Sequence, residues 1–154
     1  EATQQKLLED FKEHRVEKLY RAIVLGELKK TTLEAPVGRA SGHRRIQVSV
    51  WGKQAKTAFK ALKIFRGISL IEARPQSGRS HQIRAHLAYL GYPVLNDPDW
   101  FTIKEKTVLE GICGLVPPRM MLHSYSLKFC HPKSNTDVRF VAPLPRDFRD
   151  YWAH

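Results

Sequence analysis

The chain has 154 residues, of which 26 are Lys or Arg and 15 are Asp or Glu, so its formal net charge is +11. This length is typical of one soluble domain, residues 1–154, that buries about two-thirds of the surface of its unfolded chain. No run of about eighteen apolar residues and no signal peptide is visible, which argues against a membrane protein. The cysteines, Cys113 and Cys130, form neither a metal-binding spacing nor a disulfide framework, which favours a reducing compartment.

The first half of the chain predicts a helix followed by strands. Residues 2–15 carry a short apolar face at helical spacing, and residues 16–25 predict a strand. Residues 26–45 form a polar connector in which proline and glycine mark turns. Alternation of apolar and polar residues predicts three more strands, at residues 46–50, 57–65 and 68–74.

Residues 73–98 combine arginines, a turn and a helix in one short unit. Arg74, Arg79 and Arg84 fall at intervals of five, and a Gln-Ser-Gly turn lies between the first two. A fork of guanidinium donors meets a carboxylate or phosphate with two parallel hydrogen bonds. The unit therefore predicts an anion-binding site.

The helix of this unit is predicted to begin at Ser80, a suitable N-cap, and to end at Gly91. Apolar residues at i, i+4 and i+7 anchor the helix to a core. Arg84 lies beside this stripe, where it can enter a half-buried cleft. The alternative for Arg84 is a solvated helix face.

The last third of the chain predicts a hairpin and a short helix. Residues 92–109 predict irregular structure rich in aromatic and acidic side chains. Residues 119–129 and 137–142 predict a β-hairpin, and residues 146–152 a terminal turn of helix. Because strands outnumber helices, we predict an α+β fold with a mixed, mostly antiparallel sheet and flanking helices.

Positive charge gathers at Lys29–Lys30, Arg39–Arg45 and Lys53–Lys63, as well as in the arginine unit. Such clusters favour a polyanionic partner such as nucleic acid, although a basic chain can also simply be soluble. The Lys53–Lys63 segment could alternatively form a helical basic face for a membrane surface, but its alternation favours a strand.

The histidines do not form a metal-binding pattern. His81 and His86 lie about 140° apart around a helix, whereas a zinc pair would lie at i and i+4. His123 is interpreted as a packed or hydrogen-bonded strand residue. We therefore predict no metal site. The chain also lacks a Gly-x-Ser-x-Gly elbow, a Walker loop and a dinucleotide fingerprint, so no motif supports a hydrolase, an NTPase or a dehydrogenase.

One segment resembles the signature of the RluA-type pseudouridine synthases. It reads Gly78-Arg79-Ser80-His81-Gln82-Ile83-Arg84-Ala85-His86, followed by Leu90-Gly91-Tyr92-Pro93 and Asp97. Residues 16–26 resemble the family's Lys-x-Tyr-x-Ala-x-Val-x-Gly strand, and the segments 122–132 and 140–143 resemble its closing strands. This resemblance implies the pseudouridine-synthase core as the fold.

The resemblance also implies an isomerase that acts on uridine in ribosomal or transfer RNA without a cofactor. In the family an aspartate attacks the nucleotide, the glycosidic bond breaks, and the base rotates and is rejoined through C5. Tyr20 matches the tyrosine that packs on the base and is proposed to help remove the C5 proton, and Arg84 matches the arginine that pairs with the aspartate. The side chains expected to contact RNA are Lys53, Lys56, Arg74, Arg79 and His81.

The family's His-Arg-Leu-Asp motif, which carries the nucleophile, does not occur in these residues. We therefore interpret the chain as a catalytic domain whose core lacks its N-terminal part, and we expect the chain alone to be inactive. Arg84 is then expected to be an uncompensated charge beside an empty pocket. Two functions remain open: part of an active synthase, or a catalytically silent RNA-binding module. We expect a monomer in the cytoplasm, or in an organelle if a targeting segment has been trimmed.

Overall fold

The computed structural model describes residues 1–12, 16–40 and 42–153 of the chain. Its main feature is a six-stranded sheet in which hydrogen-bonded neighbours follow the order β2, β5, β6, β1, β7, β8. The pairings between these strands are antiparallel. The strands are β1 (Glu17–Leu25), β2 (Lys30–Glu34), β5 (Lys56–Phe65), β6 (Ile68–Pro75), β7 (Leu122–Cys130) and β8 (Asp137–Val141).

A small sheet and several helices accompany the large sheet. The small sheet is the hairpin of β3 (Val37–Arg39) and β4 (Ile46–Val48). Among the described residues, no helix combines the length and the apolar character needed to cross a bilayer. The helices are α1 (Ala2–Lys12), α2 (Gln82–Leu90), α3 (Ile103–Cys113) and α4 (Arg146–Ala153).

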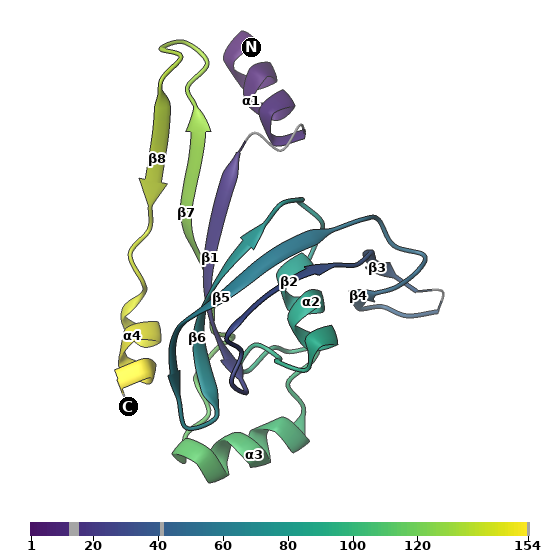
Figure 1. Cartoon of the computed structure of the whole chain (residues 1–154), viewed down its shortest axis with the longest axis vertical. Helices are drawn as coiled ribbons and strands as arrows, with labels where there is room; N and C mark the ends of the chain where they lie inside the picture. Colours follow the sequence, from purple (N-terminus) through teal and green to yellow (C-terminus); the bar gives the residue numbers. More distant parts are fainter. Residues whose placement is uncertain (13–15, 41, 154) are drawn as a thin grey trace.

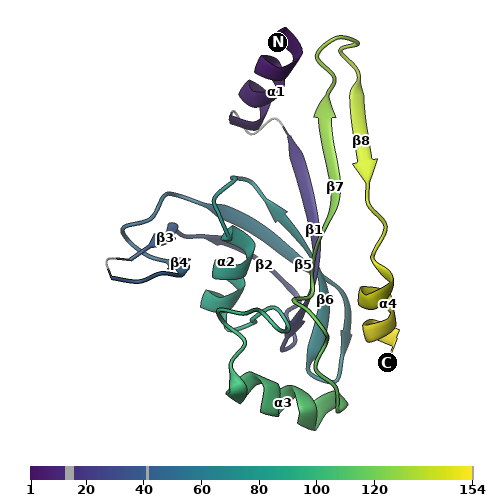
Figure 2. The same ribbon diagram turned by 180° about the vertical axis from the view of Figure 1, so that it is seen from behind.

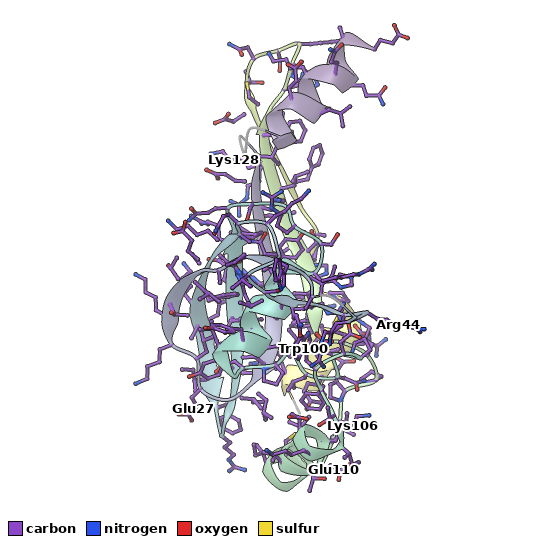
Figure 3. All side chains as sticks on the ribbon, turned by 90° about the vertical axis from the view of Figure 1, so that its right-hand side faces the viewer. Glu27, Arg44, Trp100, Lys106, Glu110 and Lys128 are labelled. Atoms are coloured by element: carbon purple, nitrogen blue, oxygen red, sulfur yellow. The ribbon has the colours of Figure 1, made fainter. Side chains whose placement is uncertain are left out.

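The helices lie on different sides of the central strand. Figures 1 and 2 place α2 and the β3–β4 hairpin on one side of β1, and α4 on the other. Helix α3 lies at the end of the sheet where β5 turns into β6 (Figure 1). The β7–β8 hairpin and α1 extend from the body as a narrow arm, and a side view shows Lys128 on this arm (Figure 3).

The core forms around β1 and β6, the two middle strands of the sheet. Ala22, Ile23 and Val24 of β1 are completely buried, and consecutive buried apolar residues are typical of a strand that has no solvent face. Leu87 of α2 and Phe148 of α4 belong to the same apolar cluster. One core therefore anchors helices that lie on both sides of β1.

The α+β class and the antiparallel sheet predicted from the sequence are confirmed. The strands predicted at residues 16–25, 57–65 and 68–74 correspond to β1, β5 and β6. The predicted hairpin of residues 119–129 and 137–142 corresponds to β7 and β8. These segments have strong apolar alternation or continuous apolar runs, so each strand could be predicted from its own residues alone.

The prediction of a polar connector at residues 26–45 is wrong, because this segment contains β2 and β3. Strand β2 is short, and only its Thr31 and Leu33 are half-buried. Its hydrogen bonds come from β5, more than twenty residues further along the chain, and no local pattern reports such a pairing. The strand predicted at residues 46–50 exists as β4 but ends at Val48, and Val50 is 85% exposed.

Among the helix predictions, the first and the last are confirmed as α1 and α4; residues 13–15 of the first lie outside the described residues. The N-cap prediction is wrong, because His81 caps α2 in a left-handed conformation with φ of 53°. Gly91 ends α2 as predicted, with φ of 89°.

The prediction of irregular structure at residues 92–109 is also wrong in its second part, because α3 begins at Ile103. The Thr102 amide donates a hydrogen bond of 2.8 Å to Glu105 Oε2. This capping box has a Thr-x-x-Glu spacing that was readable in the sequence.

Candidate active site

The loop between β6 and α2 is held by a buried polar network. Gln82, the first residue of α2, accepts hydrogen bonds through Oε1 from Ser77 Oγ at 2.7 Å and from the Arg79 amide at 3.2 Å. Its Nε2 donates to the Lys56 carbonyl and to Thr57 Oγ1, both at 2.9 Å. Gln82 is 4% exposed, so these bonds form away from water and attach the loop to β5.

His86 continues this network one turn later in α2. Its Nε2 lies 2.9 Å from the Ala35 carbonyl oxygen, and its Nδ1 lies 2.8 Å from Thr57 Oγ1. Because a carbonyl can only accept, Nε2 carries the proton and Nδ1 accepts from the Thr57 hydroxyl. Burial lowers the pKa of His86 below its ordinary value, although the hydrogen bond with Ala35 opposes this shift. The neutral imidazole is therefore the form that fits the network.

Arg84 is the buried cation of the site. Its Nε donates to Asp97 Oδ2 at 2.8 Å, and its Nη2 donates to Asp97 Oδ1 at 2.7 Å. Nη2 also donates to Asp99 Oδ2 at 2.7 Å. The hydrogen bonds with Asp97 raise the pKa of Arg84 above its ordinary value, although burial opposes this shift. Arg84 is therefore charged and fixed in orientation.

The expectation that Arg84 is an uncompensated charge is wrong, because Asp97 and Asp99 neutralise it. The solvated helix face is also excluded, since Arg84 is only 8% exposed. Within the described part of the chain, no residue accepts a hydrogen bond from Nη1. The guanidinium can therefore still donate from Nη1 to a bound anion while two carboxylates hold its other nitrogens.

A cavity of about 410 Å³ lies beside Arg84. Tyr20, Arg79, His81 and Arg84, which were named from the sequence as site residues, all line this cavity. Tyr20 pairs in register with β6 on one side and β7 on the other, so its ring rises from the middle of the sheet. None of the described lining residues is acidic, and the cavity suits a carboxylate or a phosphate.

The other predicted RNA contacts lie outside this cavity. Arg74 is exposed near the end of β6, and Lys53 is exposed beside the β3–β4 hairpin, where its backbone pairs with Val37. Lys56 begins β5 and is half-buried, and its amide donates to Ser77 Oγ at 3.1 Å. These three cations therefore do not line the cavity, and Arg74, which alternates with Ala73 and Pro75 along β6, points to the other face of the sheet.

Lys18 is a lining residue that the sequence reasoning missed. Its Nζ donates to the Ser77 carbonyl at 3.3 Å, and burial lowers the pKa of Lys18 below its ordinary value. Lys18 lies two residues before Tyr20 in the Lys-x-Tyr pattern of β1, which was the available signal. The pairing of Arg84 with Asp97 and Asp99 had no such signal, because those aspartates follow in an irregular loop.

The β3–β4 hairpin contacts the loop that holds Arg84. Arg45 Nη1 donates to the Asp99 carbonyl at 3.2 Å, and the Arg45 guanidinium carbon lies 3.9 Å from the Trp100 ring centroid. Figure 3 shows Arg44 projecting from the outer side of the molecule, with Trp100 nearer its middle. A basic surface is therefore connected to the buried ion pairs through Asp99.

Close packing also fixes this hairpin against its neighbour. A Cβ atom at Gly52 would lie 2.4 Å from the Val37 carbonyl carbon, which is closer than real contacts allow. Gly52 therefore lets the chain that leads to Lys53 pass directly against β3.

Comparison with known proteins identifies the family of the chain. Residues 1–89 match the family described as RNA pseudouridylate synthase. An RNA pseudouridine synthase of Chloroflexus aurantiacus is 36% identical over 145 residues, which are 93% of this chain and 43% of that protein. The ribosomal large subunit pseudouridine synthase D of Nitrosomonas europaea is 35% identical over 144 residues, which are 92% of this chain and 41% of that protein. The chain thus spans less than half the length of these relatives.

Solved structures give the same result for the fold. Human RNA pseudouridylate synthase domain containing 1 superposes with a TM-score of 0.77 at 26% identity, over 94% of this chain and 61% of that chain. Human RNA pseudouridylate synthase domain containing 4 has a TM-score of 0.72 at 19% identity, over 97% of this chain and 66% of that chain, and this match supports the fold alone. Since the family match covers more than half of its residues, the chain belongs to the RNA pseudouridylate synthase family.

Proposed function

We propose that this chain is the downstream part of the catalytic domain of an RNA pseudouridine synthase, which isomerises uridine to pseudouridine in structured RNA. The nucleophilic aspartate would come from an upstream segment, so the 154 residues alone would be inactive. The chain would be one truncated domain that acts as a monomer, without a cofactor, on ribosomal or transfer RNA. Its compartment would be the cytoplasm or an organelle.

The observation that carries this proposal is the shared cavity of Tyr20 and Arg84. Arg84 is oriented there by Asp97 and Asp99, and its Nη1 has no acceptor among the described residues. A guanidinium within about 4 Å of an aspartate keeps that carboxylate ionised, and therefore nucleophilic, even when it is buried. Arg84 would position and ionise the nucleophile in this way.

Tyr20 would act on the base. A uridine inside a structured RNA must leave its stack before a side chain can reach the glycosidic bond, and an aromatic ring supports a flipped base. No described residue hydrogen-bonds the Tyr20 hydroxyl, which leaves this group available to take part in removal of the C5 proton. Arg79 and His81, which also line the cavity, would contact the phosphates that flank the flipped nucleotide.

A second candidate is a catalytically silent RNA-binding module. This candidate is favoured because Asp97 and Asp99 neutralise the charge of Arg84, so the guanidinium has carboxylate partners even when no nucleophilic aspartate is present. The cavity and its basic surroundings could therefore persist in a protein that binds RNA and does not modify it.

The two candidates are separated by measuring pseudouridine formation in a uridine-labelled RNA pool. We expect activity in the full-length gene product and none in the 154-residue chain. In the full-length product, Tyr20→Phe should lower turnover at least about 100-fold, as expected for loss of an acid-base group, while RNA affinity stays within about twofold. Tyr89→Phe is the matched control, because Tyr89 is 63% exposed on α2, and it should leave turnover unchanged.

Silence of the full-length product with RNA still bound would select the binding module instead. Near-normal turnover of Tyr20→Phe in an active product would mean that another group removes the proton. Absence of both activity and RNA binding would contradict both candidates.

A further inference from the structure

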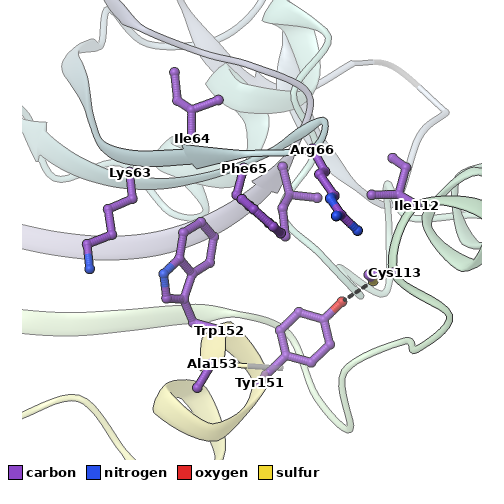
Figure 4. A pocket seen from close by; sticks show the side chains of 10 residues that line it. Lys63, Ile64, Phe65, Arg66, Ile112, Cys113, Tyr151, Trp152 and Ala153 are labelled. Atoms are coloured by element: carbon purple, nitrogen blue, oxygen red, sulfur yellow. Dashed lines mark hydrogen bonds between the residues drawn. The ribbon is translucent and has the colours of Figure 1, made fainter.

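A second cavity, of about 620 Å³, lies at the other end of the sheet. It forms where the β5–β6 turn meets the end of α3 and helix α4 (Figure 4). The two cavities share no lining residue. Ile68 and Pro75, which line one cavity each, lie at opposite ends of β6, about 23 Å apart in an extended strand. A ligand in the second cavity would therefore be remote from Tyr20 and Arg84.

Aromatic rings line this second cavity. Phe65 is 59% exposed at the end of β5, and Trp152 projects toward it from α4 (Figure 4). The aromatic pairs recorded within the described residues lie elsewhere, on β7 and β8. Within the described chain, the faces of Phe65 and Trp152 are thus not stacked on another ring. Such surfaces are typical platforms for a planar heterocycle.

Tyr151, which lines the cavity, is fixed by hydrogen bonds. Tyr151 is 7% exposed, and its hydroxyl donates to the Leu115 carbonyl at 2.8 Å. The same hydroxyl lies 3.4 Å from Cys113 Sγ, which joins α4 to the end of α3 (Figure 4). These contacts hold α3 and α4 together beside the cavity.

Lys63 and Arg66 provide positive charge around the rings. Figure 4 shows them on the two sides of the Phe65 and Trp152 pair. The Arg66 guanidinium carbon lies over the Phe65 ring, 5.1 Å from its centroid, so this cation makes a cation–π contact with one face of the ring. None of the described residues that line the cavity is acidic. The electrostatics therefore favour an anionic ligand.

We infer that this cavity binds a nucleotide, with its base stacked on Phe65 and Trp152 and its phosphate held by Lys63 or Arg66. The volume lies within the range of small-molecule sites. An apolar peptide would contact the aromatic rings but would give Lys63 and Arg66 no anionic partner. A nucleotide would contact the rings with its base and the cations with its phosphate. A free nucleotide and an unpaired nucleotide of an RNA chain share this chemistry. The inference does not depend on the proposed isomerase activity, because no residue is common to the two sites.

The test uses the full-length gene product with two probes, adenosine 5′-monophosphate in equilibrium dialysis and a fluorescein-labelled oligoadenylate in fluorescence anisotropy. Phe65→Ala and Arg66→Gln should each weaken binding about tenfold, in line with the loss of one stacking surface or one phosphate contact. Phe140→Ala and Arg139→Gln on β8 are the controls. Phe140 is 58% exposed, which matches Phe65, and Arg139 is exposed like Arg66.

Weakened binding of the monophosphate in the two cavity variants, but not in the controls, supports a site for free nucleotides. Weakened binding of the oligoadenylate alone supports a site for a nucleotide within RNA. Equal affinities in all the variants, or no binding of either probe at millimolar concentration, would overturn the inference. Thermal unfolding of each variant establishes that the substituted proteins are folded, as expected for exposed side chains. Tyr20→Phe should leave monophosphate binding unchanged, which separates this result from a failure of the isomerase proposal.

Discussion

Arg84 shows how a buried charge can be both stable and available for chemistry. Its side chain is 10% exposed and that of Asp97 is fully buried, so both ions have left water. Such a transfer is tolerated only when the partners are close and hydrogen-bonded, and removing one partner leaves the other charge uncompensated. Asp97 therefore stabilises Arg84, while Asp99, whose side chain is 38% exposed, adds a weaker and more hydrated contact.

We predict that Arg84→Ala lowers the free energy of unfolding by about 3–5 kcal/mol, because Asp97 is left as an unpaired buried charge. Adding Asp97→Ala should recover part of that loss, so the double variant is less destabilised than the sum of the single variants. Urea denaturation of the 154-residue chain, followed by circular dichroism, measures these values. Asp99→Asn serves as the control and should cost no more than about 1 kcal/mol, as for partly exposed ion pairs. Additive effects of Arg84→Ala and Asp97→Ala would show that the two ions are not coupled.

At the scale of single residues, the sequence predicted side chains that line the cavity but did not predict the carboxylates that hold Arg84 in place. Tyr20 and Arg84 could be named because they occur within recognisable motifs, and both line the same cavity. Asp97 was recognised only as the last residue of the family signature, with no role assigned to it. Its role depends on the path of the loop after α2, which brings a carboxylate back to a helix that has already ended.

At the scale of elements, one polar network joins α2, the preceding loop and β5. Thr57, Gln82 and His86 are buried and bond to one another in series. The network reaches the backbone at Lys56 and at Ala35, so it links segments far apart in the sequence. Because Arg84 lies between Gln82 and His86 on α2, the network also sets the position of its guanidinium.

Stability should fall in mild acid because of His86. Burial lowers the pKa of His86 in the folded state below the ordinary value of 6.5. As pH decreases, the unfolded state therefore takes up the proton first, and the free energy of unfolding falls. This contribution is complete above about pH 6.5 and is lost progressively as pH falls toward the lowered pKa.

The measurement is the free energy of unfolding at a series of pH values between about pH 8 and pH 5. The unmodified chain should lose more stability over this range than His86→Gln, which has no titrating group at that position. His81→Gln is the control, because His81 is exposed, and it should keep the pH dependence of the unmodified chain. If His86→Gln lost stability as steeply as the unmodified chain, another group would be responsible.

Elements with a strong internal pattern were predicted correctly, and elements that depend on distant partners were not. The continuous apolar run Ala22–Val24 indicates a buried strand, and the periodic apolar stripe on α2 indicates a helix with one face against the core. Both patterns can be recognised without knowing the rest of the fold. Strand β2 has only two half-buried residues and takes its hydrogen bonds from β5. A short edge strand of this kind cannot be recognised without knowledge of its partner.

On the scale of the whole molecule, the fold brings separate basic segments to the neighbourhood of one cavity. Arg79 lines the cavity, and its Nε donates to the Gln54 carbonyl at 3.0 Å, next to exposed Lys53. The β3–β4 hairpin carries further arginines and contacts the Arg84 loop through Arg45. Basic side chains gathered in this way suit the phosphate backbone of RNA.

RNA binding by this protein should weaken steeply with salt, because neutralised phosphates release their counterions. Lys53→Gln should reduce the slope of log affinity against log salt concentration by about 1, the effect of one lost phosphate contact. Lys128→Gln on the β7–β8 arm, where Lys128 lies 3.7 Å from Asp137, should leave the slope unchanged. Filter binding at several salt concentrations measures the slopes. A slope near zero for the unmodified protein would contradict both RNA-binding proposals.

The amino-acid sequence by itself determined the fold class, the central strands, α2 with its buried stripe, the positive charge and the family motif. These features are local, because each depends on periodicity or on residues that are close together in the chain. The tertiary structure decided which carboxylates hold Arg84, how Gln82 and His86 fix the loop, and where the second cavity lies. Each of these depends on contacts between residues far apart in the sequence, such as Ala35 with His86 and Tyr151 with Leu115. Such pairings form only in the folded chain, so no local pattern could have shown them.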